Sequence, residues 1–270
     1  MVDPEIIKHI ALKTGLSINY ISKDAKISEV IEQLKILFKN EMLVLKGGTA
    51  INRGYLEEPK RFSEDLDIDY ISEEKLEVKI EHIKERMKDI KGFQLDKPAI
   101  IHRTLRFDCH YENEFQKKDT IRIEFYLSHN LLVAVKPPEE GLLKSNLETT
   151  KPCLFTIYSL EDVIARKLLA LYNRTEGRDI YDTFYLLDLD HDPPQLIKSI
   201  ELILEAYNQE MMVEEFLDGI IAILEKSLEN ARYIGNSTNH YLMKTFRPNW
   251  REFIATLKQK MEKLKINLIN

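Results

Sequence analysis

Apolar residues recur at every third or fourth position over the first forty residues, a spacing typical of amphipathic helices. Pro4 suits the first turn of a helix, because a proline there removes no helical hydrogen bond. A second helix is expected to begin at the capping residue Ser28 and to run to Asn40. Its apolar positions keep the helical spacing: Val30, Ile31, Leu34, Leu37 and Phe38.

Beyond Asn40 the pattern changes to that of strands. Residues 42–45 form a short apolar run bounded by charge, as in a buried strand, and residues 66–71 alternate polar with apolar side chains. A helix is expected to begin within residues 50–55, between these two strands. The following expected elements are a charged helix and three further strands: residues 73–91, 100–109, 120–128 and 131–135.

From Ser159 onward nearly every segment has helical spacing. Helices are expected over residues 159–186, 194–207, 213–230 and 250–265. A proline-rich break at residues 137–141 separates this region from the strands before it. The shift predicts an α+β protein, with a mixed β-sheet domain over residues 1–150 and an α-helical bundle domain over residues 151–270.

Charge is distributed unevenly over the 270 residues. The net charge of −6 argues against a protein covered with basic contacts to nucleic acid. The segment 226–270, however, has nine Lys or Arg residues against three Glu residues and is therefore +6, which leaves −12 for the rest. A local basic face can bind a polyanion even on an acidic protein.

Export and membrane insertion are not expected. No apolar run approaches the roughly 20 residues that span a bilayer. The first residues lack the pattern of a signal peptide, so a cytoplasmic location without membrane association is expected. The two cysteines, Cys109 and Cys153, lie far apart and are expected to be reduced thiols.

The first candidate site combines Gly47, Gly48 and Thr49 with two acids, Asp65 and Asp67. Two glycines between a strand and a helix let the backbone approach phosphate oxygens. Two acids separated by one residue on a strand leave from the same face and can converge on Mg²⁺ or Mn²⁺. The alternative is a tight turn followed by a solvated strand face, and Asp69 continues that alternation.

A third carboxylate would complete a metal site. Glu124 lies on an expected strand whose apolar residues face the opposite way: Ile121, Ile123 and Phe125. As an isolated residue, Glu124 is equally compatible with a solvated position.

A second candidate site lies in the helical half, in the segment after the expected cap Ser159. Lys167 can bind a triphosphate as a point charge, and Arg174 or Arg178 can clamp it in two places. Asp179 can orient Lys167 or act as a base toward an attacking hydroxyl. The alternative is a helix hairpin with surface charge pairs.

Both stretches resemble the AbiEii/AbiGii nucleotidyltransferase-like toxin family, of the DNA polymerase β-type superfamily. The first resemblance lies in Gly47-Gly48-Thr49 and in the run from Arg61 to Ile68, and the second in Lys167, Arg174 and Arg178-Asp179 with Tyr181-Asp182. Together these stretches cover about half the chain.

This resemblance implies roles for the matching residues. It implies a nucleotidyltransferase fold in which Asp65, Asp67, Lys167 and Asp179 are catalytic, with Asp65, Asp67 and Glu124 as metal ligands. Gly47, Gly48, Thr49, Lys167, Arg174 and Arg178 are then the nucleotide-binding residues. The site is expected to need both halves of the chain.

The expected reaction is metal-dependent transfer of a nucleoside monophosphate from an NTP to a hydroxyl, with release of pyrophosphate. The resemblance further implies a toxin, with the tRNA 3′ end as a plausible acceptor and an antitoxin protein as partner. The basic C-terminal helix and Trp250 are a candidate docking surface for that RNA, or else a helix packed on a bundle. Two alternatives stay open: an inactive nucleotide- or RNA-binding module, and a transferase acting on protein or small-molecule hydroxyls.

Overall fold

The computed structural model describes residues 2–57, 61–127, 133–145 and 150–269, and the chain forms two compact units. The N-terminal unit comprises Met1–Leu132 and Pro138–Tyr158, and the C-terminal unit comprises Val133–Pro137 and Ser159–Asn270. The expected boundary at residue 150 falls before strand β8 (Cys153–Ile157), which pairs with β1 (Met42–Lys46) and so extends the N-terminal unit. That the units are independent domains stays a prediction.

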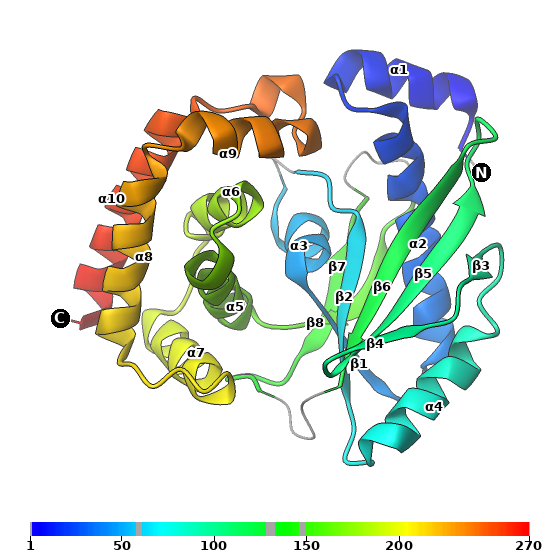
Figure 1. The fold of residues 1–270 in the computed structure, drawn as a ribbon, viewed down its shortest axis with the longest axis horizontal. Coiled ribbons are helices and arrows are strands. Elements are labelled where there is room, and N and C mark those ends of the chain that lie inside the picture. Colours follow the sequence, from blue (N-terminus) through cyan, green and yellow to red (C-terminus); the bar gives the residue numbers. More distant parts are fainter. Residues whose placement is uncertain (1, 58–60, 128–132, 146–149, 270) are drawn as a thin grey trace. The chain divides into compact units, whose positions relative to one another are not determined.

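The N-terminal unit is built on an eight-stranded sheet (Figure 1). Its order is β3-β5-β6-β2-β1-β8-β7, and β4 pairs with β5. The pairs β2–β6 and β1–β8 are parallel, whereas the others are antiparallel, so the expected mixed sheet is confirmed. The remaining strands are β2 (Asp65–Ile71), β3 (Gln94–Leu95), β4 (Ala99–Ile101), β5 (Thr104–Glu112), β6 (Lys118–Tyr126) and β7 (Glu139–Leu143).

The helices of this unit begin with α1 (Pro4–Thr14) and α2 (Ile18–Leu37), and α2 contacts β6 and β8. The expected cap at Ser28 is wrong, because Ser17 caps α2 and Ser28 lies inside it, where its hydroxyl accepts a hydrogen bond from Arg53. A four-residue helix, α3 (Gly47–Ala50), follows β1 and continues as a π-helical turn (Ile51–Tyr55), and α4 (Leu76–Met87) follows β2.

Two strand predictions need correction, and two strands were not predicted. Residues 100–109 are not one strand, because His102 adopts a left-handed backbone (φ 54°) and turns the chain from β4 into β5. Of the strand expected over 131–135, residues 133–135 form no strand, and residues 131–132 lie outside the described residues. Residue 128, the last of the strand expected over 120–128, also lies outside the described residues. Conversely, β7 and β8 were not predicted, because β7 follows the proline pair directly and carries two exposed glutamates.

The face of β2 that carries the acids is set by packing on its other face. Leu66 and Ile68 are fully buried, as are Ile121 and Ile123 on the neighbouring β6. Because side chains alternate along a strand, burial of these apolar residues turns Asp65 and Asp67 to the opposite face.

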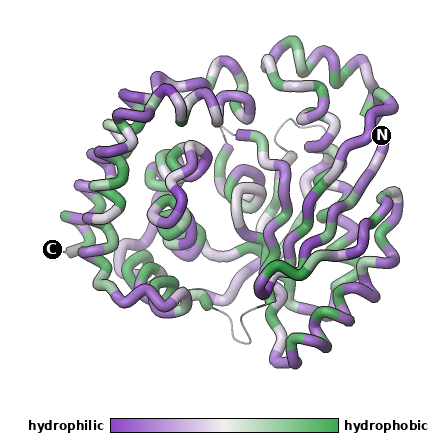
Figure 2. Tube along the Cα trace, in the orientation of Figure 1, coloured by the Kyte–Doolittle hydropathy of each residue, from purple (hydrophilic) through white to green (hydrophobic). Residues whose placement is uncertain are grey.

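The C-terminal unit is a helical bundle, as expected. Contacts between α5 and α7 and between α8 and α10 hold it together, and hydrophobic positions recur at each turn of α8 and α10 (Figure 2). Helix α9 was not predicted as a separate element. The helices are α5 (Leu160–Arg174), α6 (Gly177–Leu186), α7 (Pro193–Ala206), α8 (Val213–Ser227), α9 (Ala231–Thr238) and α10 (Trp250–Ile269). No helix among the described residues has the length and hydrophobicity of a membrane span.

Trp250 is buried, so the prediction that its ring could stack on RNA is wrong. Its ring packs against Phe253, and its indole N–H donates to Asn239 Oδ1 at 2.9 Å. Three of the four lysines of α10 are paired within the bundle: Lys258 with Glu225, Lys260 with Asp188, and Lys265 with Asp218. Helix α10 therefore packs on the bundle, which was the alternative interpretation.

Candidate functional site

Three acids lie on adjacent strands of the N-terminal unit. In the parallel pairing of β2 with β6, Asp67 is the direct partner of Glu124, and Asp65 is the partner of Arg122. Directly paired residues point to the same face of a sheet, so Glu124 stands beside Asp67. All three carboxylates are half-buried. The structure thus brings Asp65, Asp67 and Glu124 together on one face.

The neighbouring acids change the pKa of the Glu124 carboxyl. Burial raises its pKa above the ordinary value, and the negative charge of Asp67 raises it further. Asp65 adds to the effect, while Arg122 opposes it. Negative charges on neighbouring positions of a sheet repel one another, and a cation bound among the three carboxylates would relieve this repulsion.

The residues fit a divalent metal by their chemistry. Mg²⁺ and Mn²⁺ prefer carboxylate oxygens, and three carboxylates with mutual repulsion are suitable ligands. As the side chains stand, no group of three or more His, Cys, Asp or Glu within the described ranges closes around a metal position. The three carboxylates are therefore neighbours on the sheet, and metal binding would require their side chains to converge.

Gly47 lies directly against the Asp67 carboxylate. Its φ of +69° is in the left-handed region, and a side-chain carbon at this position would collide with Asp67 Oδ2. Helix α3 begins at Gly47 itself, three residues earlier than expected, so the glycines form its first turn. The close approach of backbone to carboxylate explains why a residue without a side chain stands there.

We expect Gly47→Ala to lower both metal affinity and transfer rate by about tenfold or more, because the new methyl group must displace the Asp67 carboxylate. Titration calorimetry with Mn²⁺ and a transfer assay would measure the two effects. Gly92→Ala is the matched control, because Gly92 also has positive φ (+81°) but its added carbon would meet no atom within 4 Å. An unchanged Mn²⁺ affinity in Gly47→Ala would contradict the prediction.

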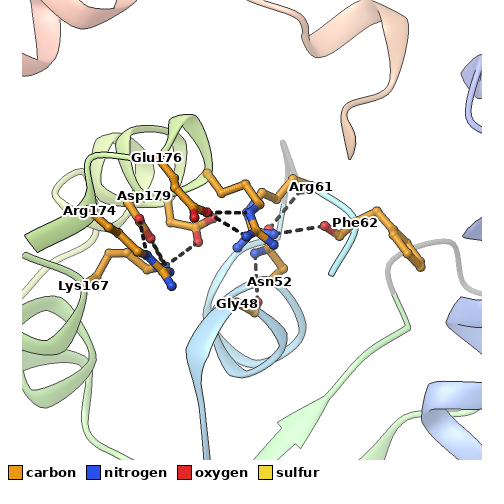
Figure 3. A network of polar contacts seen from close by, with 10 residues as sticks. Gly48, Asn52, Arg61, Phe62, Lys167, Arg174, Glu176 and Asp179 are labelled. Atoms are coloured by element: carbon orange, nitrogen blue, oxygen red, sulfur yellow. Dashed lines mark hydrogen bonds and ion pairs between the residues drawn. The ribbon is translucent and has the colours of Figure 1, made fainter. Parts of the chain in front are cut away.

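A hydrogen-bond network anchors the glycine turn (Figure 3). The buried Thr49 hydroxyl donates to the Asp65 carbonyl at 2.6 Å, which ties α3 to β2. The buried Asn52 donates to the Gly48 carbonyl at 2.9 Å and accepts from the Arg61 backbone N–H at 2.9 Å. Arg61 belongs to the sequence motif, whereas Asn52 was not predicted. Thr49 and Asn52 hold the turn in place from inside the fold.

Asp69 is not a solvated continuation of the acidic face. It is 2% exposed, and its carboxylate pairs with Lys46 Nζ at 2.5 Å and accepts from the Tyr158 hydroxyl at 2.6 Å. The ammonium of Lys46 also lies 4.3 Å from the centre of the Tyr126 ring. Because Lys46 neutralises Asp69, we assign the acidic face beside Glu124 to the other two acids of β2, Asp65 and Asp67.

In the C-terminal unit, Lys167 is the centre of a buried charge cluster (Figure 3). Its ammonium lies 3.1 Å from Asp179 Oδ1 and 3.0 Å from Asp182 Oδ2, and both aspartates are 0% exposed. Arg174 donates from Nε to Asp179 Oδ2 at 2.8 Å and from Nη2 to Oδ1 at 3.0 Å. The structure therefore joins Lys167, Arg174 and Asp179, and it adds Asp182, for which the sequence predicted no role.

The acidity of Asp179 follows from this cluster. Burial on its own raises the pKa of its carboxyl, but the hydrogen bonds from Arg174 and the charge of Lys167 outweigh burial and lower the pKa to about 2. A carboxylate with so low a pKa is a weak base at neutral pH. Of the two roles expected for Asp179, the orientation of cationic neighbours fits this environment better.

Arg178 has different neighbours. Its guanidinium pairs with Glu176 at 2.7 Å and lies 5.4 Å from the centre of the Tyr241 ring. Burial by itself lowers the pKa of Arg178, but the hydrogen bond and charge of Glu176 raise it overall, so the side chain stays cationic. Glu176 and Tyr241 had no signal in the sequence, because neither belongs to a recognisable motif.

A mixed sheet carries acids beside the glycine turn of a short helix, which is the arrangement that the resemblance to nucleotidyltransferases implies, and the family match shows this class of enzyme. The model of one family, described as nucleotidyl transferase AbiEii toxin of the type IV toxin–antitoxin system, matches residues 30–265. The chain belongs to this family, which confirms the resemblance, and it is an NTP-using nucleotidyltransferase toxin. Enzymes of this class generally use divalent metals, and the toxin description implies a cognate antitoxin.

Two solved structures have similar folds. MenT4, a nucleotidyltransferase toxin from Mycobacterium tuberculosis, is 15% identical with a TM-score of 0.63, over 99% of this chain and 99% of that chain. JHP933 from Helicobacter pylori is 20% identical with a TM-score of 0.55, over 94% of this chain and 95% of that chain. At such identities the likeness shows the fold alone. A comparison with curated proteins found no match.

Proposed function

We propose that this nucleotidyltransferase moves a nucleoside monophosphate from an NTP to the 3′ hydroxyl of a tRNA. The hydroxyl oxygen forms a bond to the α-phosphorus, the bond from that phosphorus to the bridging oxygen breaks, pyrophosphate leaves, and the hydroxyl proton passes to solvent. The observation that carries the proposal is the pairing of Asp67 with Glu124, with the Gly47 backbone against the Asp67 carboxylate.

The N-terminal unit supplies the metal ligands in this proposal. Asp65, Asp67 and Glu124 would hold Mg²⁺ or Mn²⁺, which neutralises phosphate charge and lowers the pKa of the attacking hydroxyl. Gly47 and Gly48 let the backbone approach the phosphate oxygens. Thr49, with its hydroxyl bonded to the Asp65 carbonyl, keeps that turn next to the acids.

The C-terminal unit supplies cations in the same proposal. Lys167 and Arg174 bind the triphosphate, and Asp179 is a positioning residue that keeps both cations in place. Arg178 is a further cation for the polyphosphate or for the acceptor backbone. Buried aspartates hold the Lys167 ammonium in one position, which limits the entropy lost when a phosphate binds.

The tRNA acceptor and the cellular setting are part of the proposal. A tRNA end offers an unpaired 3′ hydroxyl, and cationic and aromatic side chains of the C-terminal unit suit such a single strand. A cytoplasmic toxin with this activity would block the tRNA end, and the antitoxin would counteract it.

One experiment tests donor and acceptor together. The protein is incubated with Mg²⁺, total tRNA and each of the four α-labelled NTPs in turn, and RNA is then separated from protein. We expect label in the tRNA fraction. A parallel sample of tRNA is first treated with periodate, which destroys the terminal 3′ diol. Loss of incorporation into this treated tRNA would locate the label at the 3′ end.

The remaining outcomes would contradict the proposal in different ways. Label in the protein fraction would indicate transfer to a protein hydroxyl, and label in a small-molecule fraction would indicate another acceptor. If an NTP binds, as judged by its protection of the protein, but no labelled product forms under any condition, the protein is an inactive binding module.

A further inference from the structure

The C-terminal unit contains a groove of about 790 Å³ beside the turn from α5 to α6, and the groove continues along α8 and α9. Its volume is within the range of about 300–1,000 Å³ that is usual for ligand pockets. None of the sequence motifs predicted it. Five side chains of the lining matter here: Arg174, Arg178, Lys226, Tyr233 and Tyr241.

The groove is basic on an acidic protein. Arg174, Arg178 and Lys226 contribute three positive charges to its lining, against one negative charge from Glu176. Lys226 is exposed, and within the described part of the chain it forms no ion pair. Because the whole chain has a net charge of −6, this local positive charge is complementary to a polyanion.

Aromatic rings accompany these cations. Tyr233 is 76% exposed on α9 and lines the groove. Tyr241 lies under the Arg178 guanidinium, and the distance from the centre of the Tyr241 ring to Cζ of Arg178 is 5.4 Å. Tyr241 is half-buried, so Tyr233 is the exposed ring of this pair. An exposed ring next to cations is the usual platform for single-stranded nucleic acid, where a base stacks on the ring and phosphates contact the cations.

The walls of the groove are held firmly. Gly177 begins α6 so close to Thr238 of α9 that any side chain on it would collide with the threonine hydroxyl. On the other side of the α5–α6 turn, Arg174 both lines the groove and donates two hydrogen bonds to Asp179. The groove therefore shares Arg174 with the Lys167 cluster of the same unit.

We propose that this groove binds the unpaired nucleotides of an RNA acceptor just upstream of its reacting 3′ end. A base stacks on Tyr233, and backbone phosphates contact Lys226 and Arg178. Arg174 then connects the bound strand to the residues that hold the triphosphate. This inference rests on the proposed function, because it assigns the acceptor a place beside the C-terminal cations.

Two substitutions in the full-length protein test the groove. We expect Tyr233→Ala to weaken binding of a labelled RNA hairpin with an unpaired 3′ tail about tenfold, in line with the loss of one stacked base. We expect Lys226→Ala to weaken it several-fold and to reduce the slope of log affinity against log salt by about 0.7, the contribution of one single-strand phosphate contact. Fluorescence anisotropy across a salt series measures both.

Matched controls separate contact from structure. Tyr233→Phe keeps the ring and should bind as wild type. Lys263→Ala removes the same charge from an exposed position of α10 outside the groove and should leave the affinity and the salt slope unchanged. A hairpin with a blunt end should bind more weakly than the tailed one and should be insensitive to Tyr233→Ala.

The outcomes distinguish the groove from the proposed reaction. If wild type labels RNA but Tyr233→Ala and Lys226→Ala bind and transfer like it, the groove assignment is overturned and the reaction stands. If no RNA is labelled, yet both substitutions weaken binding of the tailed hairpin, the groove binds unpaired RNA but not an acceptor, so both the acceptor in the proposed function and the role of the groove as its site are overturned. Absence of any binding of the tailed hairpin by wild type overturns the groove assignment.

Discussion

Asp67→Asn is expected to slow nucleotidyl transfer about a thousandfold, equivalent to about 4 kcal/mol of transition-state stabilisation. Asparagine keeps the shape of the side chain but removes the charge that binds a metal. The fold should persist, because Asp67 is half-buried and β2 is held by Leu66 and Ile68 on its other face. Single-turnover transfer assays and a thermal melt measure the two quantities, and the melting temperature should change by no more than about 2 °C.

Asp69→Asn is the matched control on the same strand and face. It removes the charge that neutralises the Lys46 ammonium at 2.5 Å, so it should lower the melting temperature while Mn²⁺ affinity stays near wild type. The opposite pattern, with metal affinity lost in Asp69→Asn and kept in Asp67→Asn, would show that the metal ligands were assigned to the wrong acids.

Lys167→Met is expected to destabilise the C-terminal unit by about 3–5 kcal/mol as well as to abolish transfer. Methionine fills a similar volume, but it leaves Asp179 and Asp182, both fully buried, without the ammonium that lies near 3 Å from each. The loss of activity therefore has two causes, and only one of them is chemical. Urea unfolding measures the stability, and transfer is assayed at a temperature where the variant is folded.

A second substitution separates these causes. Lys167→Met combined with Asp182→Asn should recover part of the lost stability, because one buried negative charge is removed with its partner, but it should recover no transfer. If the single variant melts as wild type does, the Lys167 cluster is less buried than the structure describes. If the folded single variant transfers at the wild-type rate, Lys167 has no role in triphosphate binding.

The acidic face was predictable because it depends on a local rule. Alternation along β2 places Asp65 and Asp67 on one face, and the same rule on β6 places Glu124 opposite its apolar neighbours. What the sequence could not provide is the pairing of β2 with β6, which joins residues more than fifty positions apart. The neighbour relation of Asp67 and Glu124 therefore needed the structure.

Asn52 shows why the support of the site was missed. Its partners, the Gly48 carbonyl and the Arg61 N–H, are backbone groups well separated along the chain, and no side-chain pattern records them. Asp182 is a different case. It follows Asp179 by three residues on α6, and helical spacing of that kind places two side chains on one face, so its contact with Lys167 was within reach of sequence reasoning.

Local signals failed where tertiary packing decided the outcome. Ser28 has the chemistry of a helix cap, but α2 passes through it because Ile21, Ala25 and Ile27 continue the buried face upstream. Trp250 and the lysines of α10 have the chemistry of an RNA surface, yet burial of the ring and ion pairs of Lys258, Lys260 and Lys265 assign this helix to the bundle. The basic groove, in contrast, is formed by residues from separate helices, and of its segments only the one with Arg174 and Arg178 is distinctive in the sequence.

The most direct measurement is single-turnover transfer from an α-labelled NTP to tRNA by wild type, Asp67→Asn and the folded Lys167→Met, side by side at one temperature. Because the carboxylates belong to the N-terminal unit and the lysine to the C-terminal unit, we expect both substitutions to reduce labelled tRNA about a thousandfold or more. Transfer at the wild-type rate by either variant would contradict the proposal that the two clusters serve one reaction.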